Sequence, residues 1–258
     1  MPDAAHTGLR NLLIACADSK LLLGYHYGEW TFGTPALEAA IANCSLAQTE
    51  LGHVRLLHAV LRNHFDVDSD ALIDRRRPAA FANVGYLDTP ITDWPGFVAA
   101  NYVVDLAVTR MLYALRDSAF RPLRMSVEKM LDEERYHIHH GQGWFRTLAT
   151  RDAKSREAVR TAVNDALSTV VEWFGPDGDA EDTALVEGGC KAQLNTAILM
   201  SVFEDIAEAA GPLDVHLDVE RHTSFEGWDP ATRRRDGAGP DPEILQHLRG
   251  SKNEMFKL

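Results

Sequence analysis

The feature that most constrains the fold is a repeated motif, Glu-x-x-His, which occurs at residues 50–53 and again at residues 134–137. Each copy lies in a long stretch where apolar residues recur every three or four positions, the period of a helix that buries one face. Residues three apart share a helix face. Each motif can therefore direct a carboxylate and an imidazole toward one point inside a helical bundle.

Apolar periodicity, with the positions of proline and glycine, predicts the other helices. We expect helices at about 7–28, 36–64, 93–117, 121–148, 155–174, 190–210 and 242–248. Asp93 is a candidate N-cap, and Pro95 suits the first turn after it. Almost no segment alternates with period two, so the predicted fold class is all-α: a bundle of four long helices with extra C-terminal helices.

The chain is expected to form a single domain, with a core bundle at about residues 7–148 and extra helices at 155–210. The tail, residues 213–258, is rich in Gly, Pro, Asp and Arg over its first thirty or so positions. A structureless tail of this length is unusual in a compact fold. We therefore expect it to wrap the surface of the bundle or a partner.

Composition narrows the function. The 258 residues carry 26 Lys and Arg against 38 Asp and Glu, a formal net charge of −12, which argues against binding to nucleic acid or to an anionic membrane. No stretch approaches the roughly 18 apolar residues that a membrane span needs. Three cysteines without a Cys-x-x-Cys pair indicate neither a disulfide framework nor a zinc site. We therefore expect a cytoplasmic protein in a reducing compartment.

Each motif is preceded by a helix with one polar residue in an apolar run. Asp105 lies 29 residues before Glu134 (134 − 105 = 29), and the equivalent position 30 residues before Glu50 is Lys20 (50 − 30 = 20). The two halves therefore read as a weak repeat of a two-helix unit. Two Glu-x-x-His pairs with a carboxylate from each of two further helices make a di-iron or di-manganese site. The candidate metal ligands are Glu50, His53, Asp105, Glu134 and His137.

The order and spacing of these motifs resemble the oxygenase component of ring-1,2-phenylacetyl-CoA epoxidase, a ferritin-like bacterial multicomponent monooxygenase of the phenylacetic acid catabolic protein family. The resemblance spans roughly residues 10–215. That component pairs a catalytic di-iron subunit with a homologous structural subunit that has lost its metal site. Residues 28–30, 135–137 and 143–144 are similar to the structural subunit. Residues 50–53, 133–134 and 214–229 are similar to the catalytic subunit.

The resemblance implies a ferritin-like four-helix bundle, and it places the family's metal ligands at the five candidate residues. It implies insertion of one oxygen atom into the aromatic ring of phenylacetyl-CoA, with electrons from a separate flavin and iron–sulfur reductase. It also implies a homologous ferritin-like partner, in a hetero- or homodimer. The chain has no GxGxxG motif and no cysteine cluster with which to bind the reductase cofactors itself.

One departure from the family matters. Its catalytic subunit has Glu where this chain has Lys20, and a protonated ammonium cannot ligate a cation. Lys20 could instead pair with Glu50 and Glu134 and relieve the repulsion between carboxylates that lack a metal. We therefore take Glu50, Glu134 and Lys20 as the residues that decide the chemistry.

Three states of the site are open: a mononuclear iron or manganese held by Asp105, Glu134 and His137 with Glu50, a metal-free network around Lys20, or a di-iron site with Lys20 turned away or neutral. Three functions remain correspondingly open. The chain is part of a monooxygenase that acts on an aromatic acyl-CoA, a non-catalytic structural subunit that scaffolds a di-iron partner, or a metal-binding protein without oxygenase activity.

Overall fold

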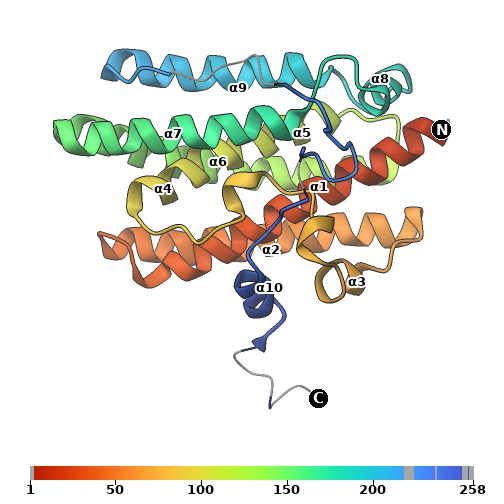
Figure 1. Ribbon diagram of the computed structural model, residues 1–258, viewed down its shortest axis with the longest axis horizontal. Coiled ribbons are helices and arrows are strands. Elements are labelled where there is room, and N and C mark those ends of the chain that lie inside the picture. The colour runs from red at the N-terminus through yellow and green to blue at the C-terminus, as the bar shows by residue number, and fades with distance from the viewer. Residues whose placement is uncertain (1–2, 218–223, 236, 252–254, 256–258) are drawn as a thin grey trace.

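The computed structural model describes residues 3–217, 224–235, 237–251 and 255, and it is helical throughout (Figure 1). Four long rods form the central bundle: α1 (Asp3–Glu29), α2 (Leu37–Phe65), the continuous segment α4–η4–α5 (Trp94–Ala99, Ala100–Val104 and Asp105–Leu115) and α6 (Arg121–Arg151). No strand occurs in these described ranges, where one isolated β-bridge joins two residues of the C-terminal segment. The predicted all-α ferritin-like class is confirmed.

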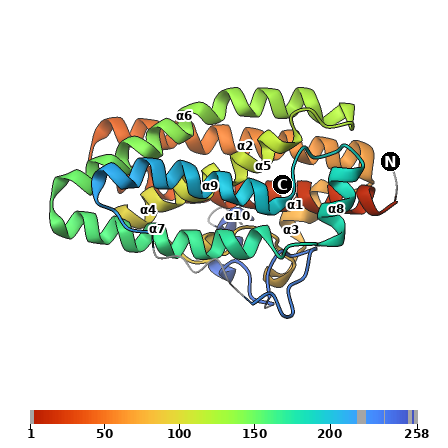
Figure 2. The ribbon, with the colours of Figure 1, turned by 90° about the horizontal axis from the view of Figure 1, so that it is seen from above.

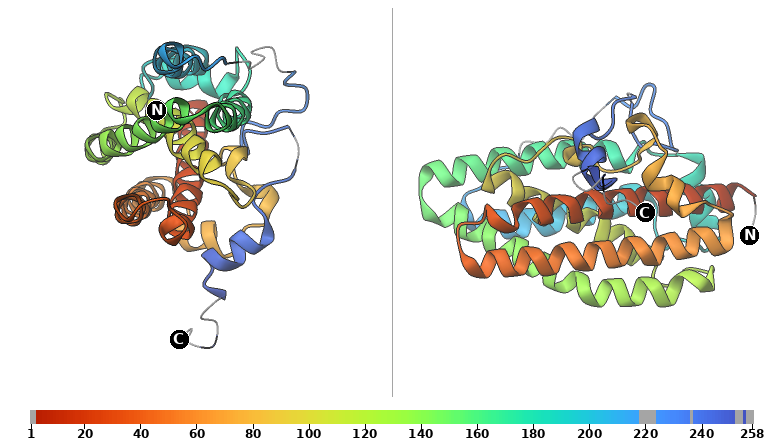
Figure 3. Two further views of the ribbon diagram at one scale, coloured as in Figure 1. Left: turned by 90° about the vertical axis from the view of Figure 1, so that its left-hand side faces the viewer. Right: turned by 90° about the horizontal axis from the view of Figure 1, so that it is seen from below.

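The four rods pack as two antiparallel pairs. α1 packs along α2, α5 packs along α6, and contacts of α2 with α6 and of α1 with α5 close the bundle. The rods run side by side along the long axis of the molecule, as the views in Figures 2 and 3 show. Each rod therefore presents one long face to a common interior.

The third rod is the most apolar. Asp93 caps it by accepting a hydrogen bond from the Gly96 amide at 2.8 Å, and Pro95 lies in its first turn, as predicted. Within the described residues, only Trp94–Leu115 is long and apolar enough to cross a membrane, and 89% of its most apolar window is buried inside the fold. Its apolar composition is that of a bundle helix surrounded by other helices.

Further helices form a second layer over the bundle. α7 (Ala153–Phe174) packs on α4 and α6, α9 (Asn195–Ala210) packs on α5, and α8 (Ala180–Glu187) packs on α1. The prediction of a helix from residue 190 is wrong at its start. The Ala192 amide donates to Ala114 O at 2.8 Å, which holds the residues before Asn195 in a connection rather than a helix.

The C-terminal segment covers the fold of its own chain. Trp228 lies against Gly175 at the end of α7, and its indole N–H donates to Glu172 O at 2.8 Å. Arg233 donates to Trp173 O at 2.6 Å. The helix α10 (Pro242–Leu248), predicted at these bounds, inserts Leu245 into a small apolar cluster beside α1, α2 and α3 (Ser69–Asp74). Part of the expected wrapping tail, residues 218–223, lies outside the described residues.

Candidate metal centre

The interior of the bundle holds a cluster of ionisable side chains, contributed by all four rods. Every member is buried, with at most 1% of its surface exposed. The cluster consists of Lys20 from α1, Glu50 and His53 from α2, Asp105 from α5, and Glu134 and His137 from α6. Helical periodicity brings them together, because each lies on the inward face of its helix.

The Lys20 ammonium lies at the centre of this cluster. Its Nζ is 2.5 Å from Glu134 Oε1, 2.6 Å from Asp105 Oδ1 and 3.1 Å from Glu50 Oε1. An ammonium has three N–H donors. Each of the three therefore has a carboxylate oxygen from a different helix within hydrogen-bond distance.

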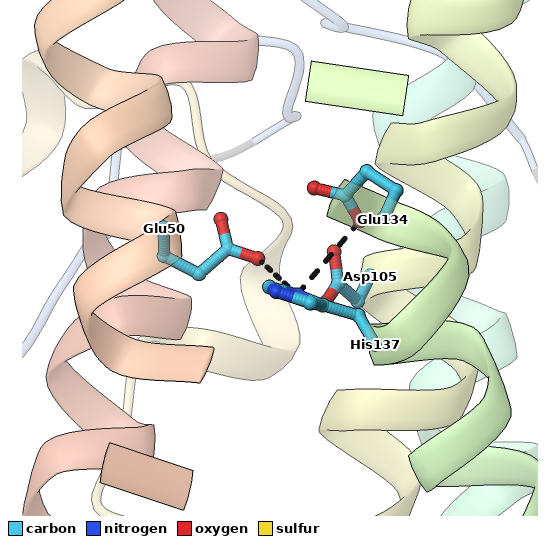
Figure 4. A group of neighbouring side chains, drawn as sticks. All are labelled: Glu50, Asp105, Glu134 and His137. Atoms are coloured by element: carbon cyan, nitrogen blue, oxygen red, sulfur yellow. Dashed lines mark hydrogen bonds and ion pairs between the residues drawn. The ribbon is translucent and has the colours of Figure 1, made fainter. Parts of the chain in front are cut away.

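His137 makes a second set of contacts with the same carboxylates. Its Nδ1 is 2.9 Å from Asp105 Oδ2 and 3.0 Å from Glu50 Oε1 (Figure 4). The Tyr27 hydroxyl also donates to Asp105 Oδ2, at 2.8 Å, and the Thr109 hydroxyl donates to Glu134 Oε2, at 2.8 Å. Asp105 and Glu134 therefore have partners on both carboxylate oxygens, whereas Glu50 Oε2 has none.

His53 is displaced from the role that the sequence suggested. Its Nε2 is 2.8 Å from Oε2 of Glu133, whose side chain is 42% exposed at the bundle surface. Its Nδ1 is 3.0 Å from Glu134 Oε1 but is not oriented for a hydrogen bond. Four of the five candidate ligands share one centre, since the ligand atoms of Glu50, Asp105, Glu134 and His137 all lie within 4.8 Å of one another.

A π-helical turn at residues 100–104 immediately precedes Asp105. Such turns insert one extra residue into a helix and are frequent at functional sites. The Asn101 side chain in this turn donates to the Tyr27 hydroxyl at 3.0 Å, and Tyr27 in turn donates to Asp105. The turn therefore helps to hold the Asp105 carboxylate toward the cluster.

Sequence reasoning identified Lys20 and the five candidate ligands but missed the hydroxyl and amide groups that hold them. Tyr27 is seven residues after Lys20 and Thr109 is four after Asp105, spacings that put each on the same helix face as the charged residue. That spacing is a usable signal for both. The π-turn that orients Asn101 has no comparable local pattern.

The cluster balances its own charge. Burial alone would lower the pKa of Lys20, but Asp105, Glu134 and Glu50 raise it well above its usual value. Burial likewise opposes the charge on His137, but the carboxylates of Glu134 and Asp105 raise its pKa to about 11.

The carboxylates divide in a corresponding way. Burial disfavours the charged form of Asp105, yet Lys20 and His137 hold its pKa well below the usual range. The pKa of Glu134 is lowered although burial and Asp105 oppose its charge, because Lys20 and His137 outweigh them. For Glu50, burial and Asp105 raise the pKa to about 7 against the effect of Lys20. Two cations thus face two firmly ionised carboxylates and a third that is close to titrating at neutral pH.

The cluster fits a two-metal centre only in part. The donor set is of the right chemical kind, because carboxylates and imidazole suit iron or manganese. However, the first rod offers an ammonium in place of a carboxylate, and this ammonium contacts three of the carboxylates that would bind metal. With Lys20 in this position, the residues do not fit two metal ions, although the remaining cluster is compact enough to hold one.

Comparisons with known proteins add an independent line of information. A family model described as phenylacetic acid catabolic protein matches residues 1–218. One of the subunits of 1,2-phenylacetyl-CoA epoxidase from Escherichia coli (strain K12) is 22% identical over 183 residues, or 69% of this chain. The match covers 58% of the length of that curated relative.

Proposed function

The chain belongs to the phenylacetic acid catabolic protein family, and from this premise we propose that it is a non-catalytic structural subunit of a phenylacetyl-CoA epoxidase-like monooxygenase. The observation that carries the proposal is the Lys20 ammonium, which contacts Glu50, Asp105 and Glu134 where those carboxylates converge. In this subunit, lysine supplies the positive charge that a metal would supply in a catalytic one.

The proposal explains why the candidate ligands persist without a complete centre. Three buried carboxylates repel one another, and one left without a positive partner is costly. Lys20 and His137 together provide two positive charges that hold the four rods at the same meeting point. The ionisable cluster thus keeps a role in specifying the bundle after the redox role is lost.

The partners follow from the same proposal. A homologous ferritin-like subunit would carry the iron and the chemistry, an aromatic acyl-CoA would be its substrate, and a separate flavin and iron–sulfur reductase would supply electrons. The name of the Escherichia coli relative, which describes one subunit of an epoxidase, supports this assignment because it belongs to a multisubunit enzyme.

An oxygenation assay tests the proposal. The purified chain, supplied with ferrous iron, a generic electron-donating reductase and phenylacetyl-CoA, should form no ring epoxide. Addition of a homologous subunit with an intact ligand set should be required for product. Product formed by the chain alone, and lost in Glu134→Ala, would remove the structural-subunit proposal.

A second candidate function, a mononuclear metal site, is favoured by one observation. Glu50, Asp105, Glu134 and His137 bring four ligand atoms within 4.8 Å of one another, and iron or manganese would accept that donor set if Lys20 withdrew. Replacement of the ammonium by the missing carboxylate tests which state the chain prefers.

We expect Lys20→Glu to acquire iron or manganese during expression, because it replaces the competing cation with a ligand of the family type. A thermal-shift titration with each metal should stabilise Lys20→Glu and leave the wild type unchanged. The control is Lys129→Glu, the same substitution at an exposed lysine of α6. Equal stabilisation of wild type and Lys20→Glu would instead favour the mononuclear site.

A further inference from the structure

The outer face of α2 carries a stripe of residues that nothing in the described chain covers. The stripe runs through positions 37, 41, 44, 48, 51 and 55, with alternating steps of four and three residues, and every one of the six residues is exposed. They are Leu37, Ile41, Cys44, Gln48, Leu51 and Arg55. Leu37 is 72% exposed and Ile41 is 64% exposed. Alternating steps of four and three are the spacing of a coiled-coil seam, along which one helix packs against another.

Two grooves flank this stripe and make α2 a ridge between them. One groove, of about 430 Å³, lies toward α6 and is lined there by Lys129 and Glu133. The other, of about 800 Å³, lies toward α3 and contains Leu51 and Ile73. Gln48 and Arg55 line both grooves. Helices pack with the ridge of one in the groove of another, so this surface has the shape to receive a second helix.

The position of the stripe leaves it open. α7 and α9 cover other faces of the bundle, and α10 packs beside α1. The end-on view in the left panel of Figure 3 shows α2 and α6 on the side opposite the C-terminal segment. An apolar stripe across nearly twenty residues of an acidic chain is the kind of surface that marks a protein interface.

We propose that this face binds a second copy of the same chain, with α2 antiparallel to α2 of the partner about a two-fold axis between Cys44 and Gln48. In an isologous pairing of this kind each copy offers the same patch. With the axis at position 46, a residue lies opposite the one whose number adds to 92. Ile41 then faces Leu51 of the other copy, and Cys44 faces its Gln48.

Charge complementarity argues for this occupant. Glu38 lies in the first turn of α2 and Arg55 lies near its middle. Within the described residues neither side chain makes an ion pair, although both are exposed. The proposed register places Glu38 of each copy beside Arg55 of the other, so one dimer gains two equivalent ion pairs. The same helix thus supplies both the apolar contacts and the complementary charges that fix its register.

Sedimentation equilibrium of the full chain over a range of concentrations tests the proposal, which does not depend on whether the interior binds metal. We expect a reversible dimer. Leu51→Glu should raise its dissociation constant about 100-fold, since the glutamates enter an apolar contact twice in each dimer. Leu194→Glu is the matched control, because Leu194 is 45% exposed and Leu51 is 44% exposed. Circular dichroism checks that both variants stay folded.

A charge reversal tests the register. Glu38→Arg and Arg55→Glu should each weaken the dimer, and the double variant should restore it, because the pair then re-forms with opposite polarity. Restoration would be inconsistent with a face that binds only some other protein.

Cys44 gives a direct check on which residues meet. It is exposed, whereas Cys16 and Cys190 are buried. A short bis-maleimide should therefore cross-link two wild-type chains through Cys44 and fail with Cys44→Ser. A chain that is monomeric at all concentrations, a dimer that Leu51→Glu leaves unchanged, or a dimer that Cys44 does not cross-link would overturn the proposal.

Discussion

At the scale of residues, the physics of the molecule centres on one lysine that is wholly buried. Moving an ammonium out of water costs several kcal/mol unless charges of opposite sign surround it. Lys20 meets that condition because it contacts carboxylates from three other helices. Removal of the ammonium would leave those carboxylates facing one another with His137 as the remaining cation beside them.

Lys20→Met should therefore destabilise the fold sharply. We expect its free energy of unfolding in urea to fall by about 3–5 kcal/mol, the usual cost of breaking a buried ion pair. Lys129→Met, at an exposed lysine, should change it by no more than about 0.5 kcal/mol. Equal effects of the two substitutions would mean that Lys20 does not hold the cluster together.

The dependence of stability on pH reports on His137. Its pKa rises from 6.5 to about 11 in the folded protein, so its stabilising effect is complete below pH 6.5 and is lost as pH rises toward 11. The difference in unfolding free energy between wild type and His137→Gln should be largest below pH 6.5 and should shrink across this window. His139→Gln, at an exposed neighbouring histidine, should show no such trend. A pH-independent gap for His137→Gln would contradict the assignment.

Sequence reasoning reached the members of the cluster because helical spacing determines which face each residue occupies. Glu50, Asp105, Glu134 and His137 share a centre for that reason. The position of His53 could not be predicted from spacing, because its pairing with Glu133 depends on the rotation of its ring relative to α6. The position of the Lys20 ammonium likewise depends on four helices at once.

At the scale of elements, the contact between α6 and the π-turn keeps the charged side chains in register. Gly141 lies one turn after His137, and a Cβ added there would come within 2.9 Å of Tyr102 Cα. The two backbones can therefore approach only because this residue has no side chain. Gly143, two residues further on, has open space around it.

Opposite effects are expected at these two glycines. Gly141→Ala should lower the free energy of unfolding by about 1–3 kcal/mol, because α6 must move away from the π-turn. Gly143→Ala should raise it by about 0.5–1 kcal/mol, because alanine favours the helix and meets nothing. Chemical denaturation of both variants measures the difference, and stabilisation by Gly141→Ala would show that the close approach is not required.

Long helices were predictable because many turns repeat the same pattern, whereas short ones were not. The bundle rods and α7 lie within a few residues of their expected bounds. α3 and α8, of six and eight residues, contain too few turns to show a period. The start of α9 was misplaced because backbone hydrogen bonds to α5 and α8 hold residues 191 and 192 in place.

At the scale of the whole molecule, the acidic composition has two components. Part of the net charge of −12 lies in the interior, where Glu50, Asp105 and Glu134 are offset locally by Lys20 and His137. The arginines of the C-terminal segment are likewise used within the fold, as Arg233 and Arg234 are buried against α7 and the loop that contains Asp88. Because the described part of that segment packs on its own chain, the open face of α2 is the surface that remains for a partner.

The central claim, that the Lys20 ammonium takes the place of a metal, is tested most directly by the metal content of the purified wild-type chain. Iron and manganese should be measured by mass spectrometry after expression in iron-supplemented medium, beside Lys20→Glu prepared in parallel. The account predicts less than about 0.1 metal ion per wild-type chain, because a protonated lysine competes for the ligands on which metal binding depends. One or more ions per wild-type chain, lost in Glu134→Ala and His137→Ala, would contradict it.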